Sequence, residues 1–365
     1  MALKCGIVGL PNVGKSTLFN CISNSKAQAA NFPFCTIEPN VGIITVPDDR
    51  LEKLSALVNP QKVQPTTVEI VDIAGLVKGA SKGEGLGNQF LGNIRETDAI
   101  LHVLRCFDDD NVVHVDGSVD PIRDKEIIDF ELQLKDLETI DKRLEKHVRA
   151  SKTGDKEAKK LVDVLSRLKA HIESGQAARS FTADDSEIML MEDLFLITAK
   201  PIMYVCNVDE GSVVSGNQYV DKVKEAVSQE NAEVLVIGAG IEADITQLDD
   251  PADRQEFLQD LGLEIPGVNK LINGAYRLLN LSTFFTAGEK EVRAWTIPTG
   301  ARAPQAAGVI HTDFEKGFIR AEVISYEDFV KYESESGARD AGRLMVEGKE
   351  YIVKDGDVMH FRFNV

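Results

Sequence analysis

The 365-residue chain lacks the features of a membrane or secreted protein. It contains no run of about 18 apolar residues, the minimum length of a transmembrane helix. Its apolar N-terminal stretch is too short for a signal peptide and leads straight into a glycine-rich motif, so we expect a first β-strand there. The sequence therefore predicts a cytoplasmic protein that makes no membrane contact.

Cysteine is sparse and unpaired in the sequence. The five cysteines are Cys5, Cys21, Cys35, Cys106 and Cys206, and no two have CxxC spacing. An odd, scattered set argues against a disulfide framework or a zinc site and favours a reducing compartment. Cys5, Cys106 and Cys206 lie in apolar stretches and are expected in the core. Cys35 lies in a predicted loop and is the one thiol for which a redox role is a hypothesis.

Basic residues are in the minority. The 41 Lys and Arg face 59 Asp and Glu, which gives a net charge of −18. Such a chain repels nucleic acid on average, so any RNA contact needs a local basic patch. Residues 135–171 are an exception, with 11 basic and 7 acidic residues. Two interpretations stay open for this stretch, a solvated surface of mixed charge or a basic prong for an RNA-rich partner.

Short apolar stretches recur through the first 280 residues, at 3–9, 67–73, 99–106, 202–207 and 233–237. Runs of this length, rich in β-branched residues and bounded by Gly, Asp or Pro, are typical of strands buried on both faces of a parallel sheet. Helical patterns lie between several of them. The alternation predicts an α/β fold with a mostly parallel sheet, which we assign to residues 1–125 and 200–280.

The alternation is interrupted by a helical insert, which we assign to residues 126–199. Apolar residues recur at three- and four-residue steps over 137–148 and again over 158–172, with a polar break at 151–155. This pattern predicts an antiparallel helical hairpin, whose apolar stripe is either a coiled-coil seam or the core face of a helical subdomain.

The last 85 residues, 281–365, have a different character. Residues 296–300 and 308–311 alternate with turn signals, and residues 350–361 read as a β-hairpin closed by Asp355-Gly356. We therefore predict a small β-rich C-terminal domain.

The strongest motif is Gly-Leu-Pro-Asn-Val-Gly-Lys-Ser at residues 9–16, between a predicted strand and a predicted helix. It matches GxxxxGK[ST], the P-loop, whose backbone N–H groups surround phosphates. Lys15 is expected to reach the β- and γ-phosphates and to assist catalysis, and the Ser16 hydroxyl is expected to bind Mg²⁺. The residues assigned to nucleotide binding here are Asn12, Val13, Gly14, Lys15, Ser16 and Thr17.

A second motif follows the strand at 67–73, where Asp72 and Gly75 form Asp-x-x-Gly. Asp72 is predicted to bind Mg²⁺ or its water, and the Gly75 N–H to contact the γ-phosphate during catalysis. Thr36, between the P-loop helix and this strand, is the third predicted metal ligand. The glycine-rich segment 79–87 is interpreted as a switch that the γ-phosphate orders.

A base-reading element is expected after a later strand, where Asn207, Val208 and Glu210 lie. The guanine-specific form is Asn-Lys-x-Asp, so Val208 replaces the Lys and Glu210 replaces the Asp. The longer Glu side chain misplaces the carboxylate, and an unmatched buried donor costs about 1–3 kcal/mol. These two replacements therefore predict that the preference for guanine is lost. Gly238, after the next strand, is predicted to line the same pocket.

The residue that positions the attacking water is not obvious. Many switches have a Gln directly after Asp-x-x-Gly, whereas this chain has Leu76. His114 is the candidate, because a neutral imidazole can orient or deprotonate water; the alternative is an ordinary surface or packing histidine. Asn12 is a candidate for helping to bind a monovalent cation such as K⁺.

Together these motifs resemble the YchF/Obg-like ATPase family, through residues 9–19, 31–40, 72–76 and 207–210. The likeness covers the whole chain. It implies an Obg-type G-domain with a helical insert and a C-terminal TGS-like (β-grasp) domain. It also implies hydrolysis of ATP in preference to GTP, binding to ribosomes, a link to translation or stress responses, and a contact between the Val208 backbone and adenine.

The leading hypothesis is thus an ATP-hydrolysing switch that binds ribosomes through its basic hairpin and TGS-like domain. One alternative is a guanine-specific GTPase in which Glu210 still reads the base. Another is a nucleotide-dependent binding module with little hydrolysis, which Leu76 favours. A P-loop kinase is disfavoured by the Asp-x-x-Gly and Thr36 elements and by the lack of an Arg-rich lid.

Overall fold

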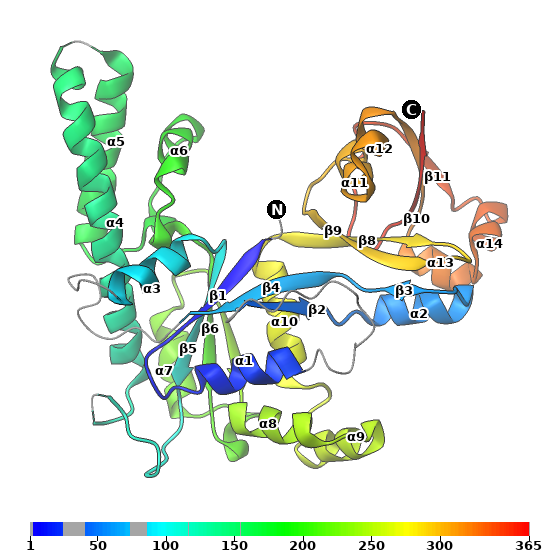
Figure 1. Ribbon diagram of the computed structural model, residues 1–365, viewed down its shortest axis with the longest axis horizontal. Helices are drawn as coiled ribbons and strands as arrows, with labels where there is room; N and C mark the ends of the chain where they lie inside the picture. Colours follow the sequence, from blue (N-terminus) through cyan, green and yellow to red (C-terminus); the bar gives the residue numbers. More distant parts are fainter. Residues whose placement is uncertain (1–2, 25–40, 74–85, 116, 154, 365) are drawn as a thin grey trace. The chain divides into compact units, whose positions relative to one another are not determined.

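The computed structural model describes residues 3–24, 41–73, 86–115, 117–153 and 155–364 (Figure 1). The chain forms two compact units, Met1–Gly42 with Glu69–Leu271, and Ile43–Val68 with Ile272–Val365. The second unit therefore includes a segment from near the N-terminus, which the sequence-based boundaries had placed with the nucleotide-binding domain.

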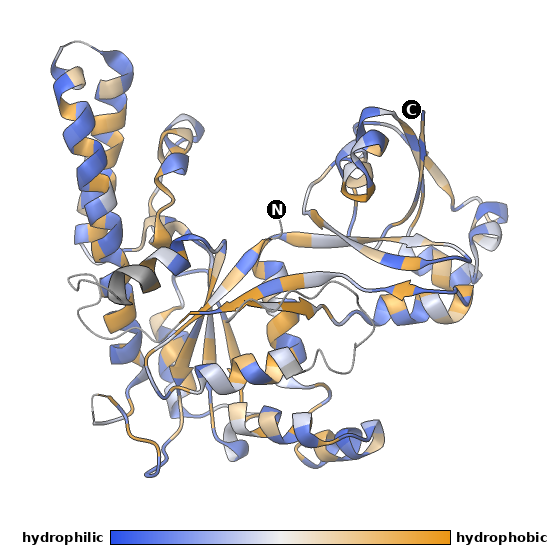
Figure 2. Ribbon diagram, in the orientation of Figure 1, coloured by the Kyte–Doolittle hydropathy of each residue, from blue (hydrophilic) through white to orange (hydrophobic). Residues whose placement is uncertain are grey.

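The first sheet carries the predicted α/β fold, with strand order β2-β4-β1-β5-β6-β7. The registered pairs β1–β4, β1–β5, β5–β6 and β6–β7 are all parallel. All residues of β5 and β6 are buried, which explains why their sequences are mostly apolar (Figure 2). The strands are β1 Lys4–Val8, β2 Val41–Thr45, β4 Thr67–Asp72, β5 Ala99–Arg105, β6 Ile202–Asn207 and β7 Glu233–Ile237.

Helices pack on this sheet. α1 contacts β1 and α8, whereas α4 contacts β5 and α7. None of the described helices is long and apolar enough to cross a bilayer. Apart from the insert, the helices that begin in the first unit are α1 Lys15–Asn24, α3 Leu86–Arg95, η5 Glu210–Ser212, α7 Gln218–Ala226, α8 Ala239–Gln247, α9 Pro251–Asp260 and α10 Gly267–Leu278. The division between the units falls within α10, after Leu271.

The predicted helical hairpin is present as α4 (Pro121–Lys152) and α5 (Lys156–Glu173). Asp155 caps α5 by accepting hydrogen bonds from the backbone N–H groups of Glu157 and Ala158. The apolar stripe of the hairpin is the core face of a helical subdomain, because Leu194 and Leu196 complete the same cluster as Ile140 and Leu165. The shorter helices are η2 Ala178–Ser180, α6 Asp185–Met191, η3 Glu192–Leu194 and η4 Ile197–Ala199.

The second unit contains a sheet of order β11-β10-β12-β8-β9-β3. Two apolar clusters stabilise it, one with α11 and one with α2, α13 and α14. The strands are β3 Val63–Gln64, β8 Leu281–Ala287, β9 Val292–Pro298, β10 Phe318–Ile324, β11 Met345–Glu347 and β12 Val358–Phe363. The helices are α2 Asp49–Val58, α11 Ala303–Ile310, α12 Thr312–Lys316, α13 Tyr326–Tyr332 and α14 Glu335–Asp340.

Two local predictions in this unit were wrong. Residues 308–311 end one helix and lead into the next, and residues 350–361 do not form a hairpin. Ile352 instead bridges Arg302, while β12 pairs with β10 and β8. A turn is present at Asp355-Gly356. The Asp355 carboxylate accepts a hydrogen bond from the Thr283 N–H at 2.7 Å. The residues on either side of the turn thus pair with distant parts of the chain and not with each other.

The cysteines predicted to lie in the core, Cys5, Cys106 and Cys206, are buried, as is Cys21, and none of the four is in a disulfide. Burial raises the pKa of Cys21 to about 11 and also raises the pKa of Cys5. Both thiols are therefore protonated and unreactive at neutral pH. Cys35 lies outside the described residues.

Candidate nucleotide-binding site

The P-loop connects β1 to α1 at the carboxyl edge of the first sheet. A Cβ on Gly9 would lie 2.7 Å from the Val103 carbonyl oxygen. Gly14 has φ +93°, and a Cβ there would lie 2.2 Å from Nδ2 of Asn207. Both positions therefore require glycine, one for space and the other for space and backbone conformation.

Asn207 connects the P-loop to the predicted base-binding side. Its buried side chain lies at the end of β6, where Nδ2 donates to the Val13 carbonyl oxygen at 2.9 Å. Its Oδ1 accepts from the Ala239 N–H at 2.9 Å, directly after Gly238 and at the start of α8. The side-chain amide of Asn207 thus links the P-loop to the start of α8 through two hydrogen bonds.

The predicted phosphate-binding cation and the predicted metal ligand face each other. Lys15 Nζ, at the start of α1, lies 2.8 Å from Oδ1 of Asp72, at the end of β4. The Ser16 and Thr17 side chains, next along α1, are exposed. The other predicted participants, Thr36 and Gly75, lie outside the described residues, as does Leu76.

These residues fit a Mg²⁺ ion that is bound together with a triphosphate. Asp72 and Ser16 offer hard oxygen atoms, the ligand type that Mg²⁺ prefers. The described residues contain no cluster of three His, Cys, Asp or Glu side chains that could hold a metal alone. Mg²⁺ in nucleotide-binding proteins is generally held by one or two protein ligands together with phosphate oxygens and water.

The predicted base-reading loop follows Asn207. The Val208 N–H donates to the Ile237 carbonyl oxygen at 2.9 Å, which extends the β6–β7 pairing by one residue. The backbone group of Val208 left to contact a base is its carbonyl oxygen. Glu210 is exposed at the start of η5.

The loop after β5 is held by Arg105, a buried side chain that sequence reasoning missed. Its guanidinium donates to three backbone carbonyl oxygens of this loop, those of Phe107, Asp109 and Val112, at 2.8–3.1 Å. Asn12 Nδ2 donates to the Val113 carbonyl oxygen at 3.1 Å. The loop that carries His114 is thus fixed and linked to the P-loop.

The His114 imidazole itself is buried and points inward. Its Nε2 lies 2.8 Å from Oδ2 of Asp124 on α4, and Asp124 also pairs with Arg123. A buried carboxylate of this kind fixes the tautomer and orientation of an imidazole. Asp124 was missed because nothing in a ten-residue His–Asp spacing marks the pair.

Comparison with known proteins places the chain in a family. The family model MMR_HSR1, described as 50S ribosome-binding GTPase, matches residues 4–137, and YchF-GTPase_C, described as protein of unknown function (DUF933), matches residues 281–364. The chain is 56% identical over 365 residues to the "Ribosome-binding ATPase YchF" of Escherichia coli O157:H7 and 55% identical over 367 residues to that of Bacillus subtilis (strain 168). Both alignments cover 100% of each protein. The chain belongs to the YchF family.

Solved structures agree with the fold of this YchF protein. The YchF GTPase of Schizosaccharomyces pombe is 39% identical, with a TM-score of 0.89 over 99% of this chain and 97% of that one. A GTP binding protein from Pyrococcus horikoshii OT3 shares the fold at 17% identity, with a TM-score of 0.61 over 99% of this chain and 100% of that one. Names within the YchF family thus include both ATPase and GTPase.

Proposed function

We propose that this YchF protein is a cytoplasmic, Mg²⁺-dependent ATP-hydrolysing switch that binds ribosomes and modulates translation or a stress response. The observation that carries the proposal is the Lys15–Asp72 pair, 2.8 Å apart at the carboxyl edge of the sheet. It brings a phosphate-binding cation and a metal-binding carboxylate to one place. The relatives named "Ribosome-binding ATPase YchF" support the same function.

In the proposed mechanism, the backbone of residues 12–17 holds the phosphates. Lys15 exchanges its contact with Asp72 for phosphate oxygens, which leaves the Asp72 carboxylate for metal binding alongside Ser16 and Thr36. A Mg²⁺ ion held by these residues would neutralise part of the phosphate charge. The Gly75 N–H then contacts the γ-phosphate. The γ-phosphate orders the switch segment 79–87, and hydrolysis releases it.

The preference for ATP follows from the loop after β6. The Val208 carbonyl oxygen can accept a hydrogen bond from the amino group of adenine, whereas Glu210 does not provide the carboxylate position that guanine needs. We expect wild-type protein to bind ATP more tightly than GTP in parallel calorimetric titrations. Restoring the guanine-type residues with Val208→Lys and Glu210→Asp should shift this ratio toward GTP by about tenfold or more.

Asp209→Ala, between the two altered positions, is the matched control and should keep the wild-type ratio. Equal or tighter binding of GTP by the wild-type protein would instead support the guanine-specific alternative, in line with the name of the Schizosaccharomyces pombe relative.

We also propose that Asn12 contributes to a K⁺ site. Its amide nitrogen is engaged with the Val113 carbonyl oxygen, so the amide oxygen is the atom offered to a cation. ATP hydrolysis should be faster in KCl than in NaCl of equal concentration, and Asn12→Ala should remove the difference. Identical rates in the two salts would exclude K⁺ as a cofactor.

For ribosome binding we propose the basic face of α4. Lys142, Lys146 and Arg149 are exposed and spaced to share one helix face. Arg143 is less suitable, because its Nη2 pairs with Oδ2 of Asp193 at 2.5 Å.

Changing these three exposed residues to Glu should weaken co-sedimentation with ribosomes, and the binding of wild-type protein should fall with added salt. Lys222→Glu with Lys224→Glu, on the exposed face of α7, is the control for added negative charge. Equal binding of the α4 variant and wild type would remove the hairpin from the interface.

A further inference from the structure

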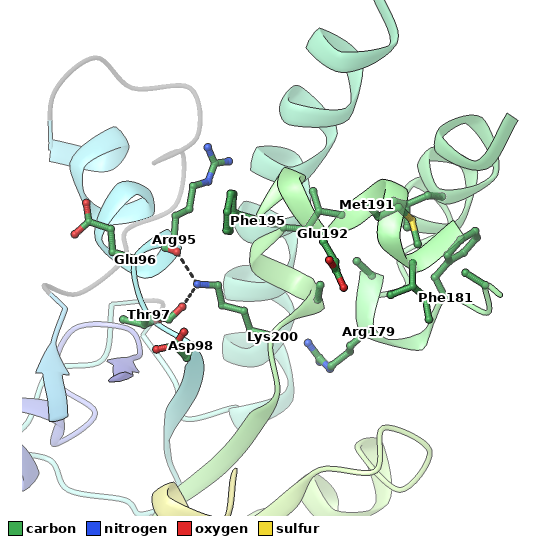
Figure 3. A pocket seen from close by; sticks show the side chains of 16 residues that line it. Arg95, Glu96, Thr97, Asp98, Arg179, Phe181, Met191, Glu192, Phe195 and Lys200 are labelled. Atoms are coloured by element: carbon green, nitrogen blue, oxygen red, sulfur yellow. Dashed lines mark hydrogen bonds between the residues drawn. The ribbon is translucent and has the colours of Figure 1, made fainter. Parts of the chain in front are cut away.

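A cavity of about 690 Å³ opens in the first unit (Figure 3). None of the described residues that are assigned to the nucleotide or to the metal lines it. Its walls come from the end of α3, from α5, and from the segment that runs through η2, α6, η3 and η4. Most of the wall is apolar, with Leu168, Phe181, Met191 and Leu196 among the lining residues. Its size is that of a ligand site, for which about 300–1,000 Å³ is usual.

The cavity lies at the opposite edge of the sheet from the P-loop. Its floor includes Asp98, directly before β5, and Lys200, two residues before β6. Asp98 accepts a hydrogen bond from the backbone N–H of Lys4, the first residue of β1. Because these strands are parallel, their amino ends gather here and their carboxyl ends gather at the nucleotide site. The cavity is therefore a separate site.

Large apolar side chains at the mouth of the cavity are exposed to solvent. Of the residues that line the cavity, Phe195 is 67% exposed and Ile188 is 45% exposed. An apolar surface that continues from a cavity onto the protein surface is typical of a site for a protein partner, which can contact the rim and also fill the cavity.

The backbone at Phe195 is in an unfavourable conformation for its side chain. Phe195 ends η3 with φ 47° and ψ 49°, the left-handed region that favours Gly or Asn. A bulky residue at positive φ is an outlier, and such outliers gather at binding sites. Here the outlier places an aromatic ring at the cavity mouth, beside Arg95 (Figure 3).

The charges around the cavity select a basic partner. The three acidic lining residues, Glu96, Asp98 and Glu192, are all exposed. Residues 181–196 add further acidic side chains and no Lys or Arg, although Glu187 and Asp193 already pair with Arg167 and Arg143. The three cations in the wall, Arg95, Arg179 and Lys200, are half-buried and already have partners, and Arg95 Nη2 donates to Oγ1 of Thr139 at 2.7 Å. Lys200 Nζ donates to the carbonyl oxygens of Ile94 and Arg95 at 2.9 and 2.7 Å, and Arg179 pairs with Glu230 at 2.8 Å.

We propose that this cavity is a docking site for a basic amphipathic segment of a partner protein. Apolar side chains of that segment fill the hollow and pack on Phe195, while its Lys or Arg side chains face the acidic rim. RNA does not fit, because the rim would repel its phosphates. The proposal goes beyond the nucleotide switch and does not depend on ATP hydrolysis.

The test uses the full chain and a fluorescein-labelled synthetic peptide of 18 residues, with Leu and Phe on one helical face and Lys on the other. Fluorescence anisotropy should show saturable binding. Phe195→Asn should weaken it at least tenfold, without lowering the melting temperature, because Asn tolerates the left-handed conformation. Ala199→Trp, which narrows the cavity from an exposed lining position, should also weaken binding at least tenfold.

Two controls separate specific docking from attraction between a cation and an acidic chain. Phe130→Ala removes an aromatic side chain that is 58% exposed on α4 and does not line the cavity, and it should leave the affinity unchanged. Phe195→Asn keeps the net charge, so equal binding by this variant and wild type would overturn the proposal. The proposal would also be overturned if the wild-type protein bound a 20-nucleotide RNA more tightly than the peptide and if Phe195→Asn and Ala199→Trp weakened that RNA binding.

Discussion

Gly14 shows how one residue decides the geometry of the nucleotide site. Its φ of +93° is unfavourable for any residue with a Cβ, and the Cβ would also collide with Asn207. Asn207 cannot retreat without losing its hydrogen bonds to the P-loop and to Ala239. The absence of a side chain at one position thus permits the link between the phosphate side and the base side of the site.

The first prediction concerns this position. Gly14→Ala should reduce the affinity for a fluorescent ATP analogue by about tenfold or more and destabilise the fold by about 1–3 kcal/mol, because it strains the backbone and displaces Asn207. Gly92→Ala is the control, since its Cβ would meet nothing within 4 Å and alanine is the better helix former. Wild-type affinity in Gly14→Ala would show that the link to Asn207 is dispensable.

The second prediction concerns His102, which is fully buried in β5 and whose ring nitrogens find no hydrogen-bond partner among the described residues. Burial, followed by the nearby charges of Lys125 and Arg179, lowers the pKa of His102 to about 3. Below pH 6.5 the unfolded chain therefore takes up a proton that the folded chain does not. Stability should fall on acidification from pH 6.5 toward pH 4, by up to about 1.4 kcal/mol per pH unit from this group.

Urea unfolding at several pH values measures this slope. The slope reports how many more protons the unfolded state binds, and His102→Phe should lower that number by about one. The substitution should not destabilise the protein at pH 7, because it removes two polar atoms that have no hydrogen-bond partner among the described residues. His360→Gln, at an exposed position, should keep the wild-type slope. An unchanged slope in His102→Phe would contradict the assignment.

The third prediction concerns His114 and Asp124. If His114 orients water, His114→Ala should lower the single-turnover rate of ATP hydrolysis about 10²-fold or more while leaving ATP affinity nearly unchanged. Asp124→Asn should lower the rate less and shift its pH profile, because Asp124 acts only by positioning the ring. His147→Ala is the control. A wild-type rate in His114→Ala would leave the histidine a structural partner of Asp124. A negligible single-turnover rate of the wild-type protein would instead favour a binding module with little hydrolysis.

At the scale of elements, the insert depends on its apolar cluster. Leu165 of α5 is fully buried against residues of α4 and of the segment that follows α6. Leu165→Ala should cost about 2–5 kcal/mol, because it leaves a cavity in this core. Lys159→Ala, exposed on the same helix, should change stability by less than about 0.5 kcal/mol. Urea unfolding followed by circular dichroism distinguishes them, and equal stabilities would mean that the cluster relaxes around the cavity.

At the scale of the whole molecule, the second unit is built from two distant parts of the chain. Leu51 and Leu54 of α2 belong to the same buried cluster as Phe285 and Val292. Arg50 Nη1 donates to Oδ2 of Asp355 at 2.6 Å, across 305 residues. A segment near the N-terminus thus completes the core and an ion pair of the C-terminal unit.

The fifth prediction follows from this discontinuity. Residues 281–365 expressed alone should not fold cooperatively, because burying Leu51 and Leu54 contributes about 1.5–3 kcal/mol for each side chain. Residues 43–68 joined through a Gly-Ser linker to residues 272–365 should fold, and Leu54→Asp in this fusion should prevent it. Dispersed amide resonances from 281–365 alone would refute the prediction.

The sequence by itself determined the elements whose signal is local. Mostly apolar runs predicted β5 and β6, because both faces of these strands are buried. The two apolar stripes and the polar break between them predicted α4 and α5, and Asp155 in that break caps α5. The P-loop was identified because its glycines and Lys15 are adjacent in the chain. Only the tertiary structure decided that Asn207 bonds Val13 across 194 residues, that His114 turns to Asp124, and that α2 joins the C-terminal unit. Such contacts depend on how the whole chain closes, and short-range propensity carries no information about which distant partner a side chain will meet.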